Sequence, residues 1–489
     1  GAVELTLDED FIADYLTTTS FSNKTPFHQI KAVPPGFTLR FDPDRQSRQE
    51  YWRLDPGLEI SYGSDGEYEE HFRELFFDAV RCRLPDSGPV CPELSGGLDS
   101  SSIVCVADAI LREEGQSRDR LQTLSYVFEE APSSDESGYI RCVEEHIGRR
   151  GVHLSEVDTP LLAPISESTL LPFPSPDHLF SRRQTAAREA MDRTGARVLL
   201  RGTAGDHVAW GEVVQPFELA DHLSKGHFRT FFKSLRSWSK SLRVPYLQLS
   251  WNAGILPLLP PKLQKYSART VDQEPANFFH PDFVRRHDLA GRMMGTEAAE
   301  GSALPSRRQH HQLIQDAAEQ VSWGFFLESG KVETTYPFLH RPLVEFCMAI
   351  EMRQKLRPGE TRSILRRSLR GYLPEPVRKR QSKRGPDEAI LRALAERSDF
   401  YTELFENPRV EAYGYVDAQK ARETLQLACH GCSDDSVSLT DIIALELWLR
   451  SIERNVSNYQ SPRTRKEAAP DVRSHLNSIH PERCVPEAV

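Results

Sequence analysis

The apolar positions of this chain follow two patterns, short continuous runs and helical spacing. Between residues 89 and 202, short apolar runs typical of buried strands alternate with stretches whose apolar positions recur at helical spacing. The expected strands are 89–94, 121–128, 152–157 and 196–202, and the expected helices are 100–114, a segment ending at Gly148, and 178–193. Strands that alternate with helices predict βαβ units and a parallel sheet.

The first sixty residues have a different pattern. Two short β-rich runs surround Pro34-Pro35-Gly36 and predict a hairpin there. A polar stretch containing glycines follows, and a helix is expected over about 69–83. We therefore expect a β-rich segment over 1–60, separate from a larger domain that begins at residue 61.

Beyond residue 215 the apolar positions fall mostly at helical spacing. In FRTFFKSLRSWSKSL, aromatic and basic residues mix in a way that also suits RNA stacking. The helical spacing of Phe228, Phe231, Phe232 and Leu235 favours an amphipathic core helix instead.

The last residues are polar and punctuated by prolines. Such a composition predicts a mobile segment rather than part of the core. The expected large domain therefore spans 61–458, and a mobile tail is expected over 459–489.

The composition is that of a globular protein. The chain has 489 residues, with 61 Lys and Arg against 71 Asp and Glu, and a net charge of −10. This balance excludes a globally basic protein that coats nucleic acid. No apolar run approaches the ~20 residues that cross a bilayer, and the first residues lack the pattern of a signal peptide. Eight scattered cysteines are too few for a disulfide scaffold. We expect a cytoplasmic enzyme with no nucleic-acid partner and no membrane span.

The strongest candidate for chemistry is LSGGLDSSS, from Leu94 to Ser102, at a predicted strand-to-helix junction. Two consecutive glycines let the backbone approach a ligand closely, and serines with amides at a helix N-terminus form an anion site. No Gly-Lys-Ser/Thr follows, so the segment is not a Walker A loop. Ser-Gly-Gly alone is also a common turn, in which Asp99 or Ser100 would merely cap the helix. The whole string after a buried strand favours phosphate binding.

This string resembles SGGxDS, the pyrophosphate loop of the asparagine synthetase family of N-type ATP pyrophosphatases. Further segments that resemble the family follow in order: RGTAGDH from Arg201 in the place of SGEGADE, VETTYPFLHRPLVEF from Val332 in the place of E-x-x-x-PFLD, and RSILRRSLRGYLPEPVRKRQSKRG from Arg362 in the place of a helix and lysine loop. The resemblance covers about residues 20–455. It implies an α/β fold, with a parallel-sheet ATP-pyrophosphatase synthetase domain like that of adenine nucleotide alpha hydrolases and many added helices.

The resemblance also implies ATP and Mg²⁺ as cofactors. The residues that it assigns to the nucleotide are Leu94, Ser95, Gly96, Gly97, Asp99, Ser100, Tyr126 and Gly202. The amides of the SGG turn, with Ser100, would hold the β- and γ-phosphates. Leu94, Tyr126 and Gly202 would frame the adenosine.

The catalytic residues that the resemblance implies are Lys383, Glu333 and Asp206. Lys383 would stabilise charge on the adenylate and pyrophosphate; without the resemblance, its basic run would be interpreted as an exposed loop. Glu333 would orient that lysine or accept a proton from the attacking amine, and its alternative is a local salt bridge. Asp99 and Asp206 would bind Mg²⁺, which takes oxygen ligands. Glu136, with Asp135, would either approach the metal or the substrate or cap the following helix.

Three departures from the family bear on the substrate. Glutamine-dependent members open with a catalytic cysteine on a full glutaminase domain. Here Gly1 opens the chain, and residues 20–55 resemble only the end of that domain, so 1–60 is expected to be a glutaminase-like remnant. Thr203 replaces the glutamate of SGEGADE, and His340 replaces the aspartate of PFLD. We expect a rebuilt substrate region beside retained ATP machinery.

This pattern resembles relatives that join a carboxylate to an amine of the same substrate. Lasso-peptide macrolactam synthetases adenylate an Asp or Glu side chain of a precursor peptide, whose N-terminal amine closes the ring. YPFLHRPLVEF and QKLRPGETRSILRRSLRG are most similar to that subgroup. The resemblance implies a leader-peptide-binding protein and a protease as partners. The alternatives are a small-molecule cyclase like the β-lactam synthetases, asparagine synthesis from aspartate with ammonia or glutamine, and a catalytically silent scaffold. β-Lactam synthetases carry a tyrosine where Thr203 stands.

Two other clusters of cysteine and histidine residues are expected to have structural rather than chemical roles. CHGC, from Cys429 to Cys432, has metal-like spacing but no second ligand pair, so packing cysteines are expected. His310 and His311 lie in the polar string RRQHHQ and are expected on a solvated helix face.

Overall fold

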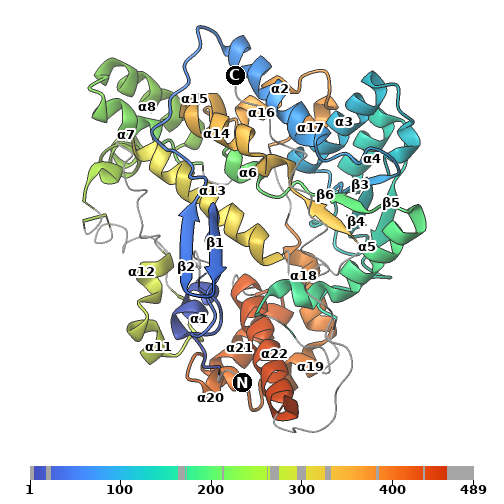
Figure 1. Cartoon of the computed structure of the whole chain (residues 1–489). Helices are drawn as coiled ribbons and strands as arrows, with labels where there is room; N and C mark the ends of the chain where they lie inside the picture. Colours follow the sequence, from blue (N-terminus) through green and yellow to red (C-terminus); the bar gives the residue numbers. More distant parts are fainter. Residues whose placement is uncertain are drawn as a thin grey trace.

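The structure, a computed structural model, is a mixed α/β fold that is mostly helical around short parallel strands (Figure 1). It describes residues 5–17, 24–163, 171, 173–211, 214–260, 263–264, 275–293, 304–324, 332–381, 385–432 and 436–459. None of the helices in these ranges is long and apolar enough to cross a membrane. The predicted tail lies outside the described residues, apart from Tyr459.

The strands of the central sheet run parallel. They are β3 (Val90–Pro92), β4 (Leu124–Val127), β5 (Val152–Ser155), β6 (Val198–Leu200) and β7 (Glu333–Thr335). Hydrogen bonds order them as β3-β6-β7 and as β4-β5. Isolated parallel bridges from Val90 to Leu121 and from Glu93 to Leu124 place β4 beside β3. The order across the sheet is therefore β5-β4-β3-β6-β7, which confirms the predicted parallel sheet.

This strand order contains a switch point between β3 and β6. The chain runs outward from β3 to β4 and β5, and then returns to the other side of β3 as β6. Open α/β sheets bind ligands beyond the carboxyl ends of the strands at such a reversal. The SGGLDS string follows β3 and the RGTAGDH string follows β6, so both strings border this position.

The predicted helices between the strands are confirmed, with bounds shifted by a few residues. They are α2 (Asp65–Arg81), α3 (Leu98–Glu113), α4 (Ser137–Ile147), η2 (Pro176–Phe180) and α5 (Ser181–Thr194); η1 (Arg118–Arg120) is a short added turn. α2 begins earlier than expected because Ser64 and Glu67 form a capping box. α4 ends where Gly148 adopts a φ of +67°.

One hydrophobic core holds β3 and α3 in place. They pack against α2, α4, α14 (Arg341–Ala349) and α16 (Ser363–Ser368). Phe72 and Phe76 from α2 and Phe346 from α14 are at most 2% exposed within this core. The turn between β3 and α3 is therefore anchored on a buried strand and a largely buried helix.

A second core joins the two ends of the described chain. The hydroxyl of Tyr15, in α1 (Glu9–Leu16), donates to the carbonyl of Asp441, in α22 (Ser436–Tyr459), at 3.1 Å. The other helices around this core are α11 (Pro281–Arg286), α12 (Leu289–Met293), α18 (Asp387–Glu396), α19 (Ser398–Leu404), α20 (Arg409–Ala412) and α21 (Ala418–Cys429). The first sixty residues thus contribute a helix as well as β structure.

The N-terminal hairpin lies later than expected. β1 (Phe37–Asp42) and β2 (Arg45–Glu50) pair in antiparallel register around a turn at residues 43–44. The prediction of a hairpin around Pro34-Pro35-Gly36 is wrong. Gly36 lies at the open end of the hairpin, where its carbonyl accepts the Tyr51 N–H at 2.8 Å.

A third group of helices projects at the upper left of Figure 1. It comprises α7 (Glu218–Ser224), α8 (Phe228–Leu242), α9 (Tyr246–Leu249), η3 (Ser250–Ile255) and η4 (Leu256–Leu258). In α8, Phe231 and Leu235 are buried as predicted, but Phe228 and Phe232 are 61% and 65% exposed. The expectation that all four face the core is wrong, because Phe232 is rotated about 100° from Phe231 around the helix.

Candidate active site

The SGGLDS string forms the turn between β3 and α3. Gly96 has a φ of +79°, and a Cβ there would lie 3.0 Å from the Cβ of Tyr139. Both the conformation and the space therefore require glycine. α3 begins after Gly97, and no side chain caps its first amides. An uncapped helix start favours anions, so the turn has a geometry suited to phosphate.

Two serine hydroxyls brace this turn. The Ser95 N–H donates to Oγ of Ser100 at 3.1 Å, and the two Oγ atoms are 2.9 Å apart. The Ser100 hydroxyl also lies 3.3 Å from the Gly97 carbonyl. Ser95 is exposed and Ser100 is buried. Ser100 thus holds the loop through hydrogen bonds from its buried side, whereas the Ser95 side chain lies on the exposed surface.

The loop after β6 packs directly on the start of α3. A Cβ on Gly202 would lie 2.8 Å from the Ser100 nitrogen, and a Cβ on Gly205 would lie 2.5 Å from Cγ of Asp99. Asp206 is the next residue and lies in α6 (Gly205–Val208). The structure therefore places the two predicted magnesium ligands in the first turns of α3 and α6, which adjoin each other.

Arg362 connects these loops. Its Nη1 donates to Oδ2 of Asp99 at 2.6 Å, in a pair whose side chains are 10% and 13% exposed. A Cβ on Gly211 would lie 2.7 Å from Nε of Arg362 and 2.9 Å from Cβ of Asp206. The arginine thus lies beside both aspartates.

Arg380 holds the turn from the other side. Its Nη1 donates to the Gly96 carbonyl at 3.2 Å, and its guanidinium lies 4.2 Å from the centre of the Tyr139 ring. The same guanidinium forms an ion pair with Glu136. Glu136 precedes α4 without a capping hydrogen bond from its side chain, and Oδ1 of Asp135 instead accepts the Ser137 N–H at 3.3 Å. Glu136 therefore acts on the turn through Arg380.

Sequence patterns did not single out either arginine. Arg362 belongs to RSILRR and Arg380 to RKRQSKRG, and a run of arginines does not indicate which of them turns inward. Arg366, in α16, is 1% exposed, and burial together with the charge of Arg362 lowers its pKa to about 10. Buried cations gathered at one helix start create a positive potential that suits a polyanion.

The predicted adenosine contacts lie on neighbouring strands. The Leu94 N–H donates to the Leu124 carbonyl at 2.7 Å, which ties the residue after β3 to β4. Tyr126, on β4, is partly buried, and Arg183 lies over its ring at 4.9 Å. Burial raises the pKa of the Tyr126 phenol, so this side chain is neutral at physiological pH. Leu94, Tyr126 and Gly202 thus come from three adjacent strand ends.

The two remaining catalytic predictions are placed differently. Lys383 lies outside the described residues. Glu333 begins β7, with an exposed side chain, and pairs with Val198 at the amino end of β6. The structure thus places Glu333 two strands away from the SGGLDS turn and at the opposite end of its strand. It does not bring the two together.

A buried chain of hydrogen bonds ends on α6, the short helix that contains Asp206. His310, in α13 (Pro305–Gly324), places Nε2 3.0 Å from the carbonyl of Val208, the last residue of α6. Nζ of Lys355, in α15 (Met352–Lys355), lies 3.0 Å from Nδ1 of the same histidine. His310 is fully buried and His311 is 9% exposed, so the expectation of a solvated face is wrong. His310 can be buried because both of its ring nitrogens have partners inside the fold, the Lys355 amine and the Val208 carbonyl.

The donor set fits Mg²⁺ held together with a nucleotide. Within the described ranges, no three His, Cys, Asp or Glu side chains gather as a ready-made metal site. Mg²⁺ usually takes one or two protein carboxylates and completes its shell with phosphate oxygens and water. Asp99 and Asp206 provide that number. The pair with Arg362 does not exhaust Asp99, because a carboxylate offers about four lone-pair positions.

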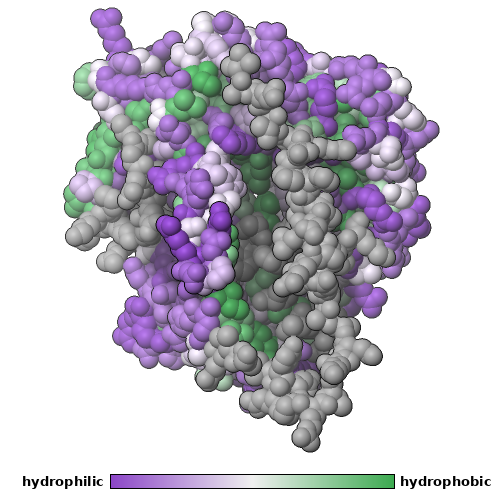
Figure 2. Space-filling model, in the orientation of Figure 1, coloured by the Kyte–Doolittle hydropathy of each residue, from purple (hydrophilic) through white to green (hydrophobic). Residues whose placement is uncertain are grey.

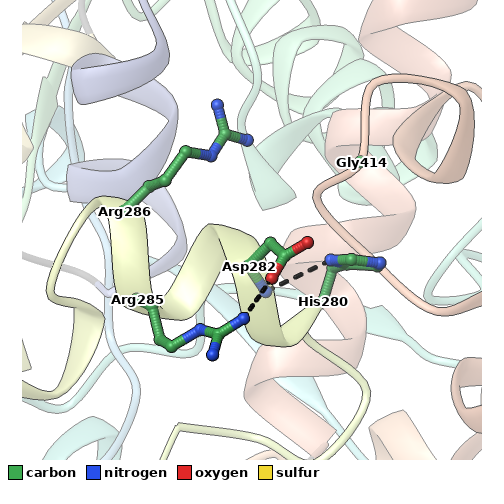
Figure 3. Close-up of a pocket in the computed structure, with 5 residues that line it drawn as sticks. All are labelled: His280, Asp282, Arg285, Arg286 and Gly414. Carbon is green, nitrogen blue, oxygen red and sulfur yellow. Dashed lines mark hydrogen bonds and ion pairs between the residues drawn. The ribbon is translucent and has the colours of Figure 1, made fainter.

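CHGC and one surface cavity lie apart from this site. Cys429 is half-buried and Cys432 is exposed, and both are free thiols. A cavity of about 440 Å³ is lined by His280, Asp282, Arg285, Arg286 and Gly414 (Figure 3). There, Arg285 and His280 converge on Asp282, whereas Arg286 points away. The cavity borders α11, at the lower left of Figure 1, far from β3 and β6.

The site lies within a region that matches a known family. Residues 71–450 match the family model described as Asparagine synthase. The matched range contains the SGGLDS turn, the loop after β6 and both inward-facing arginines.

Individual relatives are similar over parts of their length. Asparagine synthetase 3 (glutamine-hydrolyzing) of Bacillus subtilis (strain 168) is 25% identical over 369 residues, which are 72% of this chain and 53% of the relative. Amidase chyE of Penicillium rubens is 28% identical over 196 residues, which are 38% of this chain and 29% of the relative. The chain thus spans about half or less of these relatives. The solved U34-tRNA thiolase NcsA from Methanococcus maripaludis is 16% identical to this chain. Its alignment covers 55% of this chain and 85% of the thiolase chain, with a TM-score of 0.24.

Proposed function

Because the chain belongs to the asparagine synthase family, we propose that it is an ATP-dependent synthetase that joins a carboxylate to an amine. A carboxylate is a poor electrophile. Transfer of AMP from ATP converts it into an acyl adenylate and releases pyrophosphate. The amine then attacks the acyl carbon and displaces AMP, so that the products are an amide, AMP and pyrophosphate.

The observation that carries the proposal is the meeting of two loops at the switch point of the sheet. The turn after β3 presents uncapped helix amides and Asp99, and the loop after β6 packs on it and presents Asp206. Arg362 adds positive charge beside Asp99, and Arg380 adds positive charge beside the Gly96 carbonyl. This arrangement suits a triphosphate whose charge must be neutralised and whose α-phosphorus must be aligned with the carboxylate.

Each residue then has a defined task. The amides around Gly96 and Gly97 hold phosphate oxygens, and Leu94 and Tyr126 border the purine. Asp99 and Asp206 hold Mg²⁺, which when bound neutralises phosphate charge. Lys383 follows Arg380 by three residues, and we propose that it reaches the same phosphates.

We further propose that the carboxylate and the amine belong to one precursor peptide, so that the product is a macrolactam. The two substituted positions support this proposal. Thr203 lies in the loop after β6, and His340 precedes α14 with Nδ1 3.4 Å from Nη1 of Arg83. Burial and the charge of Arg83 lower the pKa of His340, so a neutral ring replaces the family's carboxylate. A leader-binding protein and a protease are the partners that this proposal implies.

Asparagine formation is the second candidate, because a relative that matches 72% of this chain is named an asparagine synthetase. An exchange of radiolabelled pyrophosphate into ATP separates the two candidates. Exchange that requires a precursor peptide supports the macrolactam proposal, whereas exchange with aspartate alone supports asparagine formation. Absence of exchange with any carboxylate would contradict the synthetase proposal itself.

The variant Asp99→Ala tests the site. We expect it to lower the exchange rate on the order of 10²-fold or more, because it removes a Mg²⁺ ligand. The matched control is Asp192→Ala, which removes a surface carboxylate paired with Arg197. An unchanged exchange rate in Asp99→Ala, with exchange intact in the control, would refute the assignment.

A further inference from the structure

The helices from α8 to η4 present an unusually charged surface. Between Lys225 and Pro260 the chain has no acidic residue, although its net charge is −10. The basic residues in this stretch are all exposed: Lys225, Arg229, Lys233, Arg236, Lys240 and Arg243. A segment of one sign in a chain of the opposite sign creates a local field that attracts polyanions.

The same elements also expose large apolar side chains. These are Phe228 (61% exposed), Phe232 (65%), Tyr246 (52%), Leu247 (87%), Trp251 (43%), Ile255 (40%) and Leu258 (40%). Figure 2 shows hydrophobic side chains gathered at the upper left, over α7 and α8. Soluble proteins rarely expose so many large apolar side chains on neighbouring elements without an interaction to cover them.

These exposed side chains are not needed for a hydrophobic core, because the helices from α7 to η3 already share a buried apolar cluster. Phe231, Leu235 and Trp238 are buried on the inner face of α8, with Leu249 from α9. The Trp238 Nε1–H also donates to Glu218 at 2.6 Å. The exposed set therefore forms a second apolar face on helices that are already anchored. We call the outer surface of α8, α9, η3 and η4, with these basic and apolar side chains, the basic apolar face.

The composition of this face discriminates among polyanions. Nucleic acids stack on aromatic rings, but aliphatic side chains such as Leu247, Ile255 and Leu258 gain nothing from a base or a phosphate. The cores of protein interfaces are depleted in lysine. Aromatic and aliphatic residues among lysines and arginines are typical of segments that lie in the interface of an anionic bilayer.

We propose that the basic apolar face docks on anionic phospholipid, which holds the enzyme at a membrane surface without a spanning helix. The lysines and arginines contact lipid head groups. Leu247, Phe232 and Trp251 insert their apolar parts at the level where head groups meet acyl chains. Figure 1 places these helices away from β3 and α3, so docking leaves the candidate active site uncovered.

Sedimentation of the full chain with lipid vesicles tests the proposal. We expect binding to vesicles of phosphatidylcholine mixed with phosphatidylglycerol, little binding to phosphatidylcholine alone, and loss of binding as salt is raised. Two variants probe the two components of the face, Phe232→Ser with Leu247→Ser for the apolar part and Lys233→Glu with Lys240→Glu for the charge. Each should weaken partitioning by roughly tenfold or more.

Matched controls keep the test specific. Val157→Ser changes an apolar side chain that is 62% exposed elsewhere, and Arg45→Glu reverses a charge on β2. Both should bind vesicles as the parent chain does, and all variants should retain its melting temperature and exchange rate. Equal binding by the parent and both patch variants would overturn the proposal, as would the absence of binding to anionic vesicles. Tighter binding through the same residues to poly-glutamate or to single-stranded RNA would overturn it in favour of an acidic protein or a nucleic acid.

Discussion

Arg362 is the side chain on which the two loops of the candidate site depend. Its φ of +51° costs a non-glycine residue of order 1 kcal/mol. A residue held against its own preference requires surrounding contacts that fix it. Here those contacts are the Trp210 carbonyl, which accepts the Arg362 N–H at 3.1 Å, and the carboxylate of Asp99.

We expect Arg362→Met to destabilise the free protein by about 2–4 kcal/mol, because it removes the ion pair between Arg362 and Asp99 at a site that is largely buried. Arg362→Lys should recover part of this loss. Urea unfolding in the absence of nucleotide measures both variants. The control is Arg392→Met, which breaks an exposed pair with Glu130 and should cost at most about 1 kcal/mol. Equal losses at positions 362 and 392 would contradict a special role for Arg362.

The position of a residue in the fold was predictable from the sequence only where the backbone dictated it. The turn was identified because the whole SGGLDS string follows an apolar run and resembles the family's pyrophosphate loop, whereas Ser-Gly-Gly alone is a common turn. His310 was misassigned, because a polar string such as RRQHHQ does not reveal partners that lie far away in sequence. Its two partners, Lys355 and the Val208 carbonyl, are 45 and 102 residues away.

At the scale of elements, the contact between the loop after β6 and the start of α3 sets the shape of the site. Gly202 and Gly205 both lie where a Cβ would meet α3 at less than 3.0 Å. Turn propensity does not predict this contact between the loop and α3, because either glycine would fit equally well in an open turn. Because α3 is so close, positions 202 and 205 have no room for a side chain on the face of the loop that meets Asp99.

We expect Gly205→Ala to push the loop away from α3, because its Cβ would lie 2.5 Å from Cγ of Asp99. The variant should lower the pyrophosphate exchange rate by roughly tenfold and destabilise the fold by about 1–3 kcal/mol. Gly138→Ala in α4 is the matched control, since a Cβ there meets nothing within 4 Å. Gly138→Ala should be neutral or stabilising by up to about 1 kcal/mol. Full activity in Gly205→Ala would show that the loop contact is not needed.

Strands with apolar runs were predicted, whereas β7 was not. Its three residues, Glu-Thr-Thr, carry no apolar side chain, and they form a strand only because β6 offers an unpaired edge. The hairpin was misplaced for a related reason. Proline and glycine at 34–36 indicate a turn, but the pairing of β1 with β2 decides where the chain reverses.

At the scale of the whole molecule, two buried ionisable groups in different cores make stability depend on pH in opposite ways. Burial lowers the pKa of Lys355 to about 7, and burial raises the pKa of Asp441 to about 7. The cost of charging Lys355 is present below pH 7 and disappears as pH rises toward 10.5. The cost of charging Asp441 is present above pH 7 and disappears as pH falls toward 3.8.

Two variants should therefore show opposite pH profiles. Relative to the parent chain, the melting temperature of Lys355→Met should be most favourable at pH 6 and progressively less so toward pH 10. Only the charged amine is penalised by burial, whereas the hydrogen bonds of Nζ to His310 and to the Cys347 carbonyl are lost at every pH. Asp441→Asn should raise the melting temperature most at pH 8 and not at all near pH 4. Thermal unfolding across this range measures both. Profiles that change in the same direction with pH in both variants, or that do not change with pH, would contradict the opposite pH dependence of the two groups.

The sequence by itself determined the alternation of strands and helices, the position of the SGGLDS turn and the family, because these depend on local periodicity and on an ordered set of strings. Only the tertiary structure decided which charged side chains turn inward. Arg362, Arg380 and Lys355 are partnered by groups distant in sequence, and local patterns carry no record of such contacts. The same holds for the basic apolar face: helical spacing predicted an amphipathic helix, but only packing showed that the inner face was already filled and that Phe228 and Phe232 remained outside.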